Sequence, residues 1–157
     1  MRFLLAFAVM FPTIAAAGVA DMAPRSGWRV IDTVLAPDVL IERLQAAVPA
    51  EGMGVVTQAG PTAGARARGV TIPENRVIGV FNNVYAVRIL NLSTAAMIEA
   101  PVRFYVTGDA DGTATLSWKP PSFVFAPYMA EAGPDLQAAA AELDAKFEAI
   151  AGRASAQ

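Results

Sequence analysis

The feature that most constrains the fold of this chain is a predicted β-hairpin over residues 102–119. Its apolar residues alternate with polar ones on both sides of a Gly-Asp-Ala-Asp-Gly turn: Val102, Phe104, Val106, Ala114, Leu116 and Trp118. An alternation of period two places one set of residues on each face of a strand. The turn between the two alternating runs predicts that the strands pair antiparallel. The remaining chain must supply a layer that covers the apolar face.

Helical spacing predicts that layer in two places. Pro37 suits a first helical turn, and the apolar residues that follow recur at helical intervals until Pro49 and Gly52: Leu40, Leu44, Ala47 and Val48. Pro134 opens a long second helix whose apolar residues repeat at four-and-three spacing: Leu136, Ala140, Leu143, Phe147 and Ile150. Each helix therefore has one apolar stripe to pack on a sheet.

Three more strands are predicted, over residues 28–35, 53–59 and 77–81. A short helix is predicted from about 82 to 92, with Asn82 or Asn83 as its N-cap. Strands mixed with helices, closing on an antiparallel hairpin and a terminal helix, indicate an α+β fold of two layers. We expect a four- to five-stranded antiparallel sheet with its helices packed on one face.

Residues 1–20 have the order of a secretory signal peptide. Arg2 precedes an uncharged apolar run, and a stretch of small residues ends at Ala20, just before Asp21. We expect cleavage near Gly18 or Asp21, a single domain over residues 21–157, and a periplasmic location with no membrane span after the signal is removed. An uncleaved membrane anchor is the alternative, although Pro12 interrupts the apolar run.

The composition excludes several kinds of chemistry. The chain has no His and no Cys, so Ser-His-Asp and Cys-His nucleophiles, iron–sulfur clusters and ordinary zinc sites are excluded. Its 12 basic and 14 acidic side chains do not form the concentrated positive surface of a nucleic-acid-binding protein. We expect no cofactor, no metal and no nucleic-acid partner. Carboxylate, Tyr, Lys and Arg chemistry is what remains.

Several runs resemble the bacterial and archaeal family called domain of unknown function 302. They are Val77-Ile78-Gly79-Val80-Phe81-Asn82, a short helix through Ala86, Ala100-Pro101-Val102-Arg103-Phe104-Tyr105-Val106, an Asp-Gly turn and Trp118-Lys119-Pro120. The resemblance spans about Val30 to Ile150. It implies a small α+β domain similar in fold to half of the TATA-box-binding protein, and a homodimer. It departs at Asn82-Asn83, where the family has Asn-Pro, and it implies no activity.

The polar row of the hairpin is the first candidate site. Arg103 and Tyr105 fall on one strand, and Thr115, Ser117 and Lys119 on the next, all on the face opposite the apolar row. Arginine and lysine beside hydroxyl groups suit a carboxylate or a phosphate. A solvated outer face or a dimer face is the alternative. Asn82, at a nearby strand-to-helix corner, completes the predicted set of ligand-binding residues.

Two other segments each allow a functional interpretation and a purely structural one. Residues 60–69 combine glycines with Arg66 and Arg68, which suits a phosphate cradle, but a flexible loop through residue 74 is favoured because no P-loop ending follows. Residues 120–129 are aromatic and uncharged. They suit a membrane or partner contact, or, as favoured here, a cap whose Phe123 and Phe125 close one end of the core. Asp109 and Asp111 are expected to be solvated turn residues.

We expect the uncovered face of the sheet to stay partly apolar, since strands at Ile31, Leu35, Val77 and Phe81 carry apolar side chains on both faces. The function favoured by these patterns is non-enzymatic. It is binding of a small molecule or a protein partner, or homodimerisation, at that face. The alternative is an enzyme acting on a small anionic substrate, with Tyr105 or Glu99 as acid or base and Arg103 stabilising an anion.

Overall fold

The predicted hairpin lies in the middle of a five-stranded antiparallel sheet. The computed structural model describes residues 20–156, so the predicted signal peptide lies, apart from Ala20, outside the described residues. The strands follow the spatial order β1-β5-β4-β3-β2: β1 (Arg29–Asp32), β2 (Gly54–Ala59), β3 (Asn75–Phe81), β4 (Val102–Gly108) and β5 (Ala114–Trp118). Every neighbouring pair is antiparallel, as predicted.

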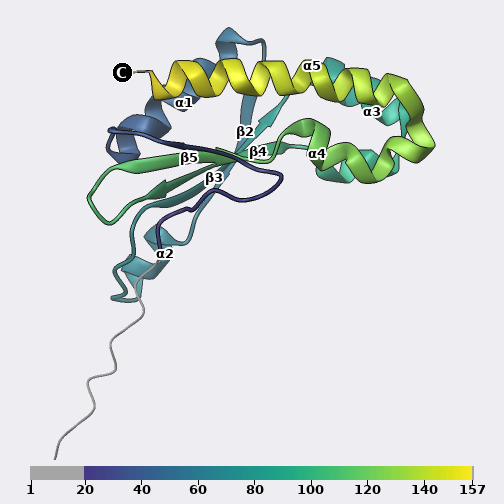
Figure 1. Ribbon diagram of the computed structural model, residues 1–157. Coiled ribbons are helices and arrows are strands. Elements are labelled where there is room, and N and C mark those ends of the chain that lie inside the picture. Colours follow the sequence, from purple (N-terminus) through teal and green to yellow (C-terminus); the bar gives the residue numbers. More distant parts are fainter. Residues whose placement is uncertain (1–19, 157) are drawn as a thin grey trace, which may run out of the picture.

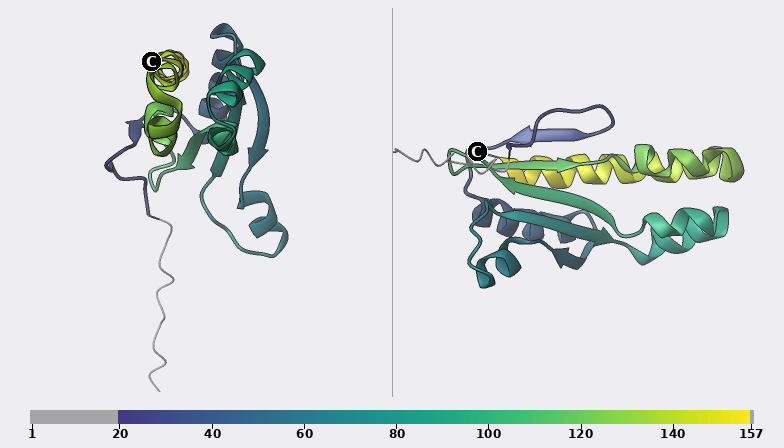
Figure 2. Two further views of the ribbon diagram at one scale, coloured as in Figure 1. Left: turned by 90° about the vertical axis from the view of Figure 1, so that its right-hand side faces the viewer. Right: turned by 90° about the horizontal axis from the view of Figure 1, so that it is seen from below.

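Two long helices, α1 (Pro37–Ala50) and α5 (Met129–Ser155), cover one face of this sheet (Figure 1). Five shorter helical segments complete the fold: the helices α2 (Thr62–Ala67), α3 (Asn83–Leu92) and α4 (Pro121–Phe125), and the 3-10 turns η1 (Ala95–Glu99) and η2 (Ala126–Tyr128). Figure 2 (right) looks onto the other side of the sheet, here named the open face, with α5 behind the strands. The α+β fold with helices on one face is therefore confirmed.

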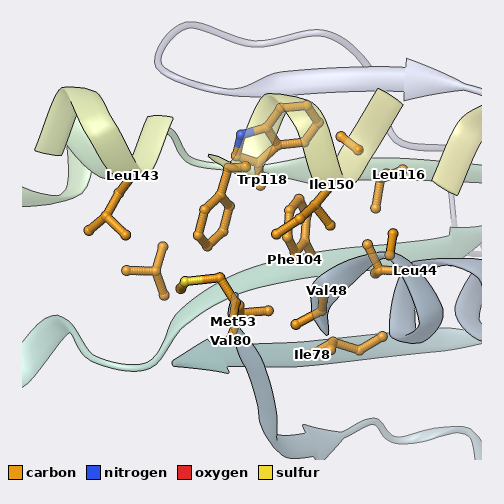
Figure 3. Packing of buried hydrophobic residues seen from close by; sticks show 14 of the residues in the cluster. Leu44, Val48, Met53, Ile78, Val80, Phe104, Leu116, Trp118, Leu143 and Ile150 are labelled. Carbon is orange, nitrogen blue, oxygen red and sulfur yellow. The ribbon is translucent and has the colours of Figure 1, made fainter. Parts of the chain in front are cut away.

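The core lies between the sheet and the two long helices (Figure 3). All the apolar positions predicted for α1 and α5 are buried, with at most 6% of any side chain exposed. From the sheet, Phe104 stacks on Phe147 of α5 with ring centroids 4.6 Å apart, and it also contacts Trp118. The apolar row of the hairpin thus packs as its period predicted.

The end of α5 that is nearer α4 departs from a straight helix. Gly133 has φ of +67°, a conformation outside the helical range, and Pro134 begins the straight part. Pro134 therefore does open the long helix as predicted, but one further helical turn, from Met129, precedes it. None of the described helices is both long and apolar enough to cross a membrane.

Two element predictions were wrong. The first strand was expected over residues 28–35, but β1 ends at Asp32 because the Thr33 hydroxyl donates to the Ala114 carbonyl at 2.6 Å and accepts the Leu35 amide at 3.2 Å. These bonds turn the chain toward α1. The stretch 60–74 was expected to be a loop, but it contains α2, whose Thr62 hydroxyl accepts the Asn75 amide at 3.1 Å and so joins the helix to β3.

The cap predicted over residues 120–129 was half right. Phe125 is 1% exposed and closes the core, whereas Phe123 is 49% exposed. Residues two apart in a helix face in nearly opposite directions, so α4 buries one ring and leaves the other outside. The outer ring packs on the backbone of Gly27.

Candidate functional site

Three rows of side chains run across the strands on the open face. The strand register defines them, reading from β1 toward β3. The row nearest the β4–β5 turn, here named the acid row, is Asp32, Thr115, Thr107 and Asn75. The middle row is Val30, Ser117, Tyr105 and Val77. One step further, past the last ladder pairs of β1 and β5, the register predicts the cation row of Trp28, Lys119, Arg103 and Gly79.

The middle row contains two of the predicted site residues, Tyr105 and Ser117. They lie directly opposite each other, so the polar face predicted from the alternation is confirmed. Ser117 is nevertheless 0% exposed, between Val30 and Tyr105, and its hydroxyl lies 3.5 Å from the Tyr105 carbonyl. The structure therefore places Ser117 beneath the surface. Tyr105 is half-buried, and its hydroxyl accepts a hydrogen bond from the Asn75 amide.

The cation row holds the other two residues of the hairpin that were predicted, Arg103 and Lys119, and both are exposed. The register places them side by side on the same face. Within residues 20–156 neither forms an ion pair with a carboxylate. Like charges directly opposite each other on a sheet are destabilising. The row is therefore a pair of adjacent cations with no acidic counterpart in the described chain.

These two cations line a hollow of about 470 Å³ on the open face, here named the sheet hollow. Trp28, Val77 and Val124 supply apolar surface, Tyr105 and Asn75 supply polar groups, and Glu99 lies in its wall. Binding sites for small molecules are commonly concave, mostly apolar, and of about 300–1,000 Å³, with a few polar groups. The sheet hollow has this size and this mixture.

Trp28 forms an aromatic wall of the hollow that the sequence did not suggest. The Trp28 amide donates to the Arg25 carbonyl at 3.3 Å across a turn whose third residue, Gly27, has φ of +75°. The Phe123 ring packs against Gly27 so closely that a Cβ there would lie 2.5 Å from the ring. Lys119 Nζ lies 5.4 Å and Arg25 Cζ 5.6 Å from the centre of the Trp28 ring, both within cation–π reach.

Gly79 leaves the next position of the cation row without a side chain. It lies opposite Arg103 on β3, and the space beside it is filled by the Thr57 hydroxyl and the Pro101 ring. A Cβ on residue 79 would meet the Thr57 oxygen and would lie 2.8 Å from Pro101 Cγ. A glycine is therefore required where Pro101 crosses onto the open face.

Glu99 is the only acidic residue that lines the sheet hollow in the described chain. It ends η1 and is half-buried, and its Oε1 accepts the Tyr128 hydroxyl at 2.9 Å. This hydrogen bond raises the pKa of Tyr128, with a smaller contribution from burial. Glu99 and Tyr105, the two groups weighed as acid or base, therefore lie in the same hollow as Arg103.

Asn82 lies elsewhere. Its Oδ1 accepts hydrogen bonds from the backbone amides of Val84 and Tyr85 at 2.8 and 3.2 Å. Asn82, and not the alternative Asn83, is therefore the N-cap of α3. Its amide group donates to the Gly52 carbonyl at 2.7 Å. It lines a separate, mostly apolar hollow with only about 30 Å³ of space, which is enough for a water molecule. Of the five predicted residues, the structure brings Arg103, Tyr105 and Lys119 together in the sheet hollow.

The acid row differs from the expectation for the hairpin turn. Thr115 Oγ1 lies 2.8 Å from Asp109 Oδ2 and 3.2 Å from Asp32 Oδ1, and the Thr113 hydroxyl donates to Asp111 at 2.6 Å. Burial raises the pKa of Asp109, and the nearby aspartates add to this. Asp109 is therefore not a solvated turn residue, whereas Asp111 is exposed as predicted. In the described range no group of three or more acidic side chains is arranged to hold a metal ion.

A second hollow, of about 440 Å³, lies between α1 and the start of β3. Its one cation, Arg76, is paired with Glu74 at 2.8 Å, and its other charged walls are the acidic Asp38 and Glu42. The positive charge of Arg76 is thus already paired with the Glu74 carboxylate. The sheet hollow is the better candidate for an anion-binding site because neither of its two cations forms an ion pair with a described carboxylate.

This chain is similar to known proteins in its fold and in its sequence family. A solved structure, described as an uncharacterized conserved protein DUF302 from Bacillus stearothermophilus, superimposes with a TM-score of 0.72 over 82% of this chain and 98% of that chain, at 22% sequence identity. At this identity the likeness shows the fold alone. No curated protein matches the chain. The family model described as "Domain of unknown function DUF302" matches residues 31–154, and the chain therefore belongs to that family.

Proposed function

We propose that this protein is an exported, non-catalytic domain that binds a small molecule in the sheet hollow, and that the ligand carries a negative group and an apolar group. One observation carries the proposal. Arg103 and Lys119 are adjacent cations in the floor of a hollow of about 470 Å³, and no described carboxylate pairs with either. A bound anion would remove their mutual repulsion.

The walls of the hollow favour an anion with an apolar part over inorganic phosphate. Trp28, Val77 and Val124 present apolar surface beside the two cations. A guanidinium binds a carboxylate through two parallel hydrogen bonds, which gives orientation as well as affinity. An aromatic or branched carboxylate would place its charged end on Arg103 and its apolar end against these walls.

Export to the periplasm is part of the proposal and rests on the signal-like order of residues 1–20. Mass spectrometry of the protein recovered from the periplasm tests it. A mass that corresponds to a start between Gly18 and Asp21 is expected. A full-length mass, or a protein found only with the membrane fraction, would contradict it.

Binding is favoured over the enzymatic alternative because Tyr105 and Glu99 are only half-buried in an open hollow. Strong burial of an acid or base beside Arg103 would have favoured catalysis. A homodimer or another protein covering the open face stays a prediction. Native mass spectrometry of the purified protein counts the subunits and retains any bound small molecule.

The binding proposal is tested with 3-phenylpropanoate, an aromatic carboxylate without any other charge. Chemical-shift titration of the labelled protein is expected to show saturable changes at the residues of the sheet hollow. The double variant R103A/K119A should bind at least about tenfold more weakly, because a hydrogen bond to a charged group contributes about 1.5–3 kcal/mol.

R43A/R153A is the matched control, since it removes two exposed cations from the helices on the other face. This control should bind 3-phenylpropanoate within twofold of the wild-type protein. Unchanged affinity in R103A/K119A, or an equal loss in both double variants, would overturn the assignment of the site.

A further inference from the structure

We infer that the ligand of the sheet hollow is an amino acid with an apolar side chain, a molecule that carries an ammonium group as well as a carboxylate. This inference rests on the proposed function and adds a second point of recognition to it. The residue that leads to it is Glu99, whose carboxylate lies in the wall of a hollow otherwise charged by Arg103 and Lys119.

Opposite charges in this hollow do not satisfy one another. Glu99 forms no ion pair with Arg103, with Lys119 or with any other cation in residues 20–156. Its one described hydrogen bond comes from the Tyr128 hydroxyl and engages Oε1 only. The second oxygen, Oε2, therefore has capacity for a charged donor supplied by a ligand.

A simple anion would match only part of this arrangement. Bound on Arg103 and Lys119, it would bring its negative charge into a hollow that already holds the Glu99 carboxylate, and like charges repel. A zwitterion places its carboxylate on the cations and its ammonium group on Glu99. The charges of the hollow and of the ligand are then paired on both sides.

The position of Glu99 is set by contacts that do not involve the cations. The hydroxyl of Tyr128, the last residue of η2, donates to Glu99 Oε1. Nearby, the Ser93 hydroxyl at the C-terminal end of α3 donates to the Glu131 carboxylate of α5. The carboxylate is thus held from the helical end of the molecule, while Arg103 and Lys119 project from the sheet. Among the described residues no ion pair joins Glu99 to either cation, and all three side chains line the same hollow of about 470 Å³, so a ligand in the hollow can contact both charges.

The test compares L-phenylalanine with 3-phenylpropanoate, which has the same carbon skeleton and carboxylate but no amino group. L-Phenylalanine is expected to bind about tenfold more tightly, since one charge-assisted hydrogen bond is gained. In Glu99→Gln this preference should disappear, while 3-phenylpropanoate binds equally well or better. Glutamine keeps an oxygen that accepts the Tyr128 hydroxyl, so the wall is preserved.

Glu131→Gln is the matched control because Glu131 lies at the same end of the molecule but does not line the hollow. It should leave the preference for L-phenylalanine within twofold. Equal binding of the two compounds, or a preference that survives in Glu99→Gln, overturns the inference and leaves the proposed function standing. If neither compound gives saturable binding that depends on Arg103 and Lys119, the proposed function itself fails.

Discussion

The two ends of the open face carry opposite charges, and they differ in the partners that the chain provides for those charges. At the β4–β5 turn, Asp109 and Asp111 accept hydrogen bonds from Thr115 and Thr113, and the Asp21 carboxylate accepts the Ala110 amide at 2.9 Å. At the other end, Arg103 and Lys119 have no carboxylate partner within the described residues. At the turn the described part of the chain supplies hydrogen-bond donors to the carboxylates, although Asp109 Oδ1 is buried without one, whereas at the other end it supplies no carboxylate to the two cations.

This difference separates charges that belong to the fold from charges that are available to a ligand. A buried or half-buried carboxylate is tolerated when the protein supplies donors to it. Two adjacent cations without a carboxylate partner repel each other and do not stabilise a sheet. Substitutions at the acid end should therefore change the free energy of unfolding, and substitutions of the cations should change ligand affinity.

The largest effect on stability is expected from Thr115→Val at the acid end. Valine has the shape of threonine without the hydroxyl, so Asp109 and Asp32 lose a donor that is 2% exposed. The free energy of unfolding should fall by about 1.5–3 kcal/mol, as for hydrogen bonds to charged groups. Urea denaturation at neutral pH measures it.

Ser117→Ala is the matched control for that substitution. Ser117 is also buried on β5, but its hydroxyl is 3.5 Å from its acceptor, too long for a strong bond. Its loss should cost less than about 1 kcal/mol. Equal losses in the two variants would contradict the view that the acid end depends on its threonine.

The next effect is expected from Gly27→Ala at the cation end. Strain at φ of +75° costs about 1 kcal/mol, and the displaced Phe123 ring adds to it, for a total of about 1–2 kcal/mol. Because this turn positions Trp28, the affinity for 3-phenylpropanoate should fall as well. Thermal unfolding and chemical-shift titration measure the two effects.

Gly112→Ala, in the β4–β5 turn, provides the comparison at the other end. Its φ is +88°, but nothing lies within 4 Å of an added Cβ. The variant should show the backbone strain without the displaced ring and with unchanged ligand affinity. Equal affinity losses in both glycine variants would mean that the turn at Gly27 has no special effect on the hollow.

A smaller effect of opposite sign is expected from Asp109→Asn. Burial raises the pKa of Asp109, so the folded state holds its proton more tightly than the unfolded chain does. Stability therefore falls as the pH rises from the ordinary value of 3.8 through the raised pKa. Removing the charge should stabilise the protein at pH 7 by less than about 1 kcal/mol, since solvent screens a partly exposed group.

Asp111→Asn should change stability in the other direction. Hydrogen bonds from Thr113 lower the pKa of Asp111, so its charge stabilises the fold above its ordinary pKa, and that contribution is lost as the pH falls through the lowered value. The variant should be less stable than the wild-type protein at pH 7. Melting temperatures measured between pH 3 and pH 7 compare the two. Shifts of the same sign would show that the two carboxylates share one environment.

The smallest effect is expected from Arg103→Gln. No described carboxylate depends on this arginine, and its neighbour in the register is Lys119, so the free energy of unfolding should change by about 0.5 kcal/mol or less. Any gain should be larger at low ionic strength, where repulsion is less screened. A loss well above this value, measured by urea denaturation, would mean that Arg103 stabilises the fold.

The fold was largely predictable because its main elements have local signatures. The alternation from Val102 to Trp118 and the four-and-three spacing after Pro134 each extend over enough residues to define one apolar face. The end of β1 and the presence of α2 were not predicted, for non-local reasons. The end of β1 depends on the Ala114 carbonyl, and α2 is joined to β3 by the Thr62 hydroxyl, so neither has a signature in its own residues.

The site was only partly predictable. Period two is enough to place Arg103, Tyr105 and Lys119 on one face, because that is a property of neighbouring strands. The burial of Ser117 depends on pairing with β1, which lies far away in sequence. Trp28 enters the hollow through a turn held by Phe123, and it precedes the residues that match the family. Contacts of this kind cannot be derived from spacing along one segment.

In the proposed binding mode, Gly79 affects the size of the molecule that the sheet hollow can accept. Pro101 rests in the space that residue 79 leaves empty, and it follows Glu99 by two positions. A methyl group at residue 79 would displace the Thr57 hydroxyl and the Pro101 ring, and Pro101 is two residues from the Glu99 carboxylate that lines the hollow. Under the proposed function, the smallest residue in the sheet thus helps to set the shape of the hollow, and enlarging it by one carbon would change which ligands fit without altering a single charge.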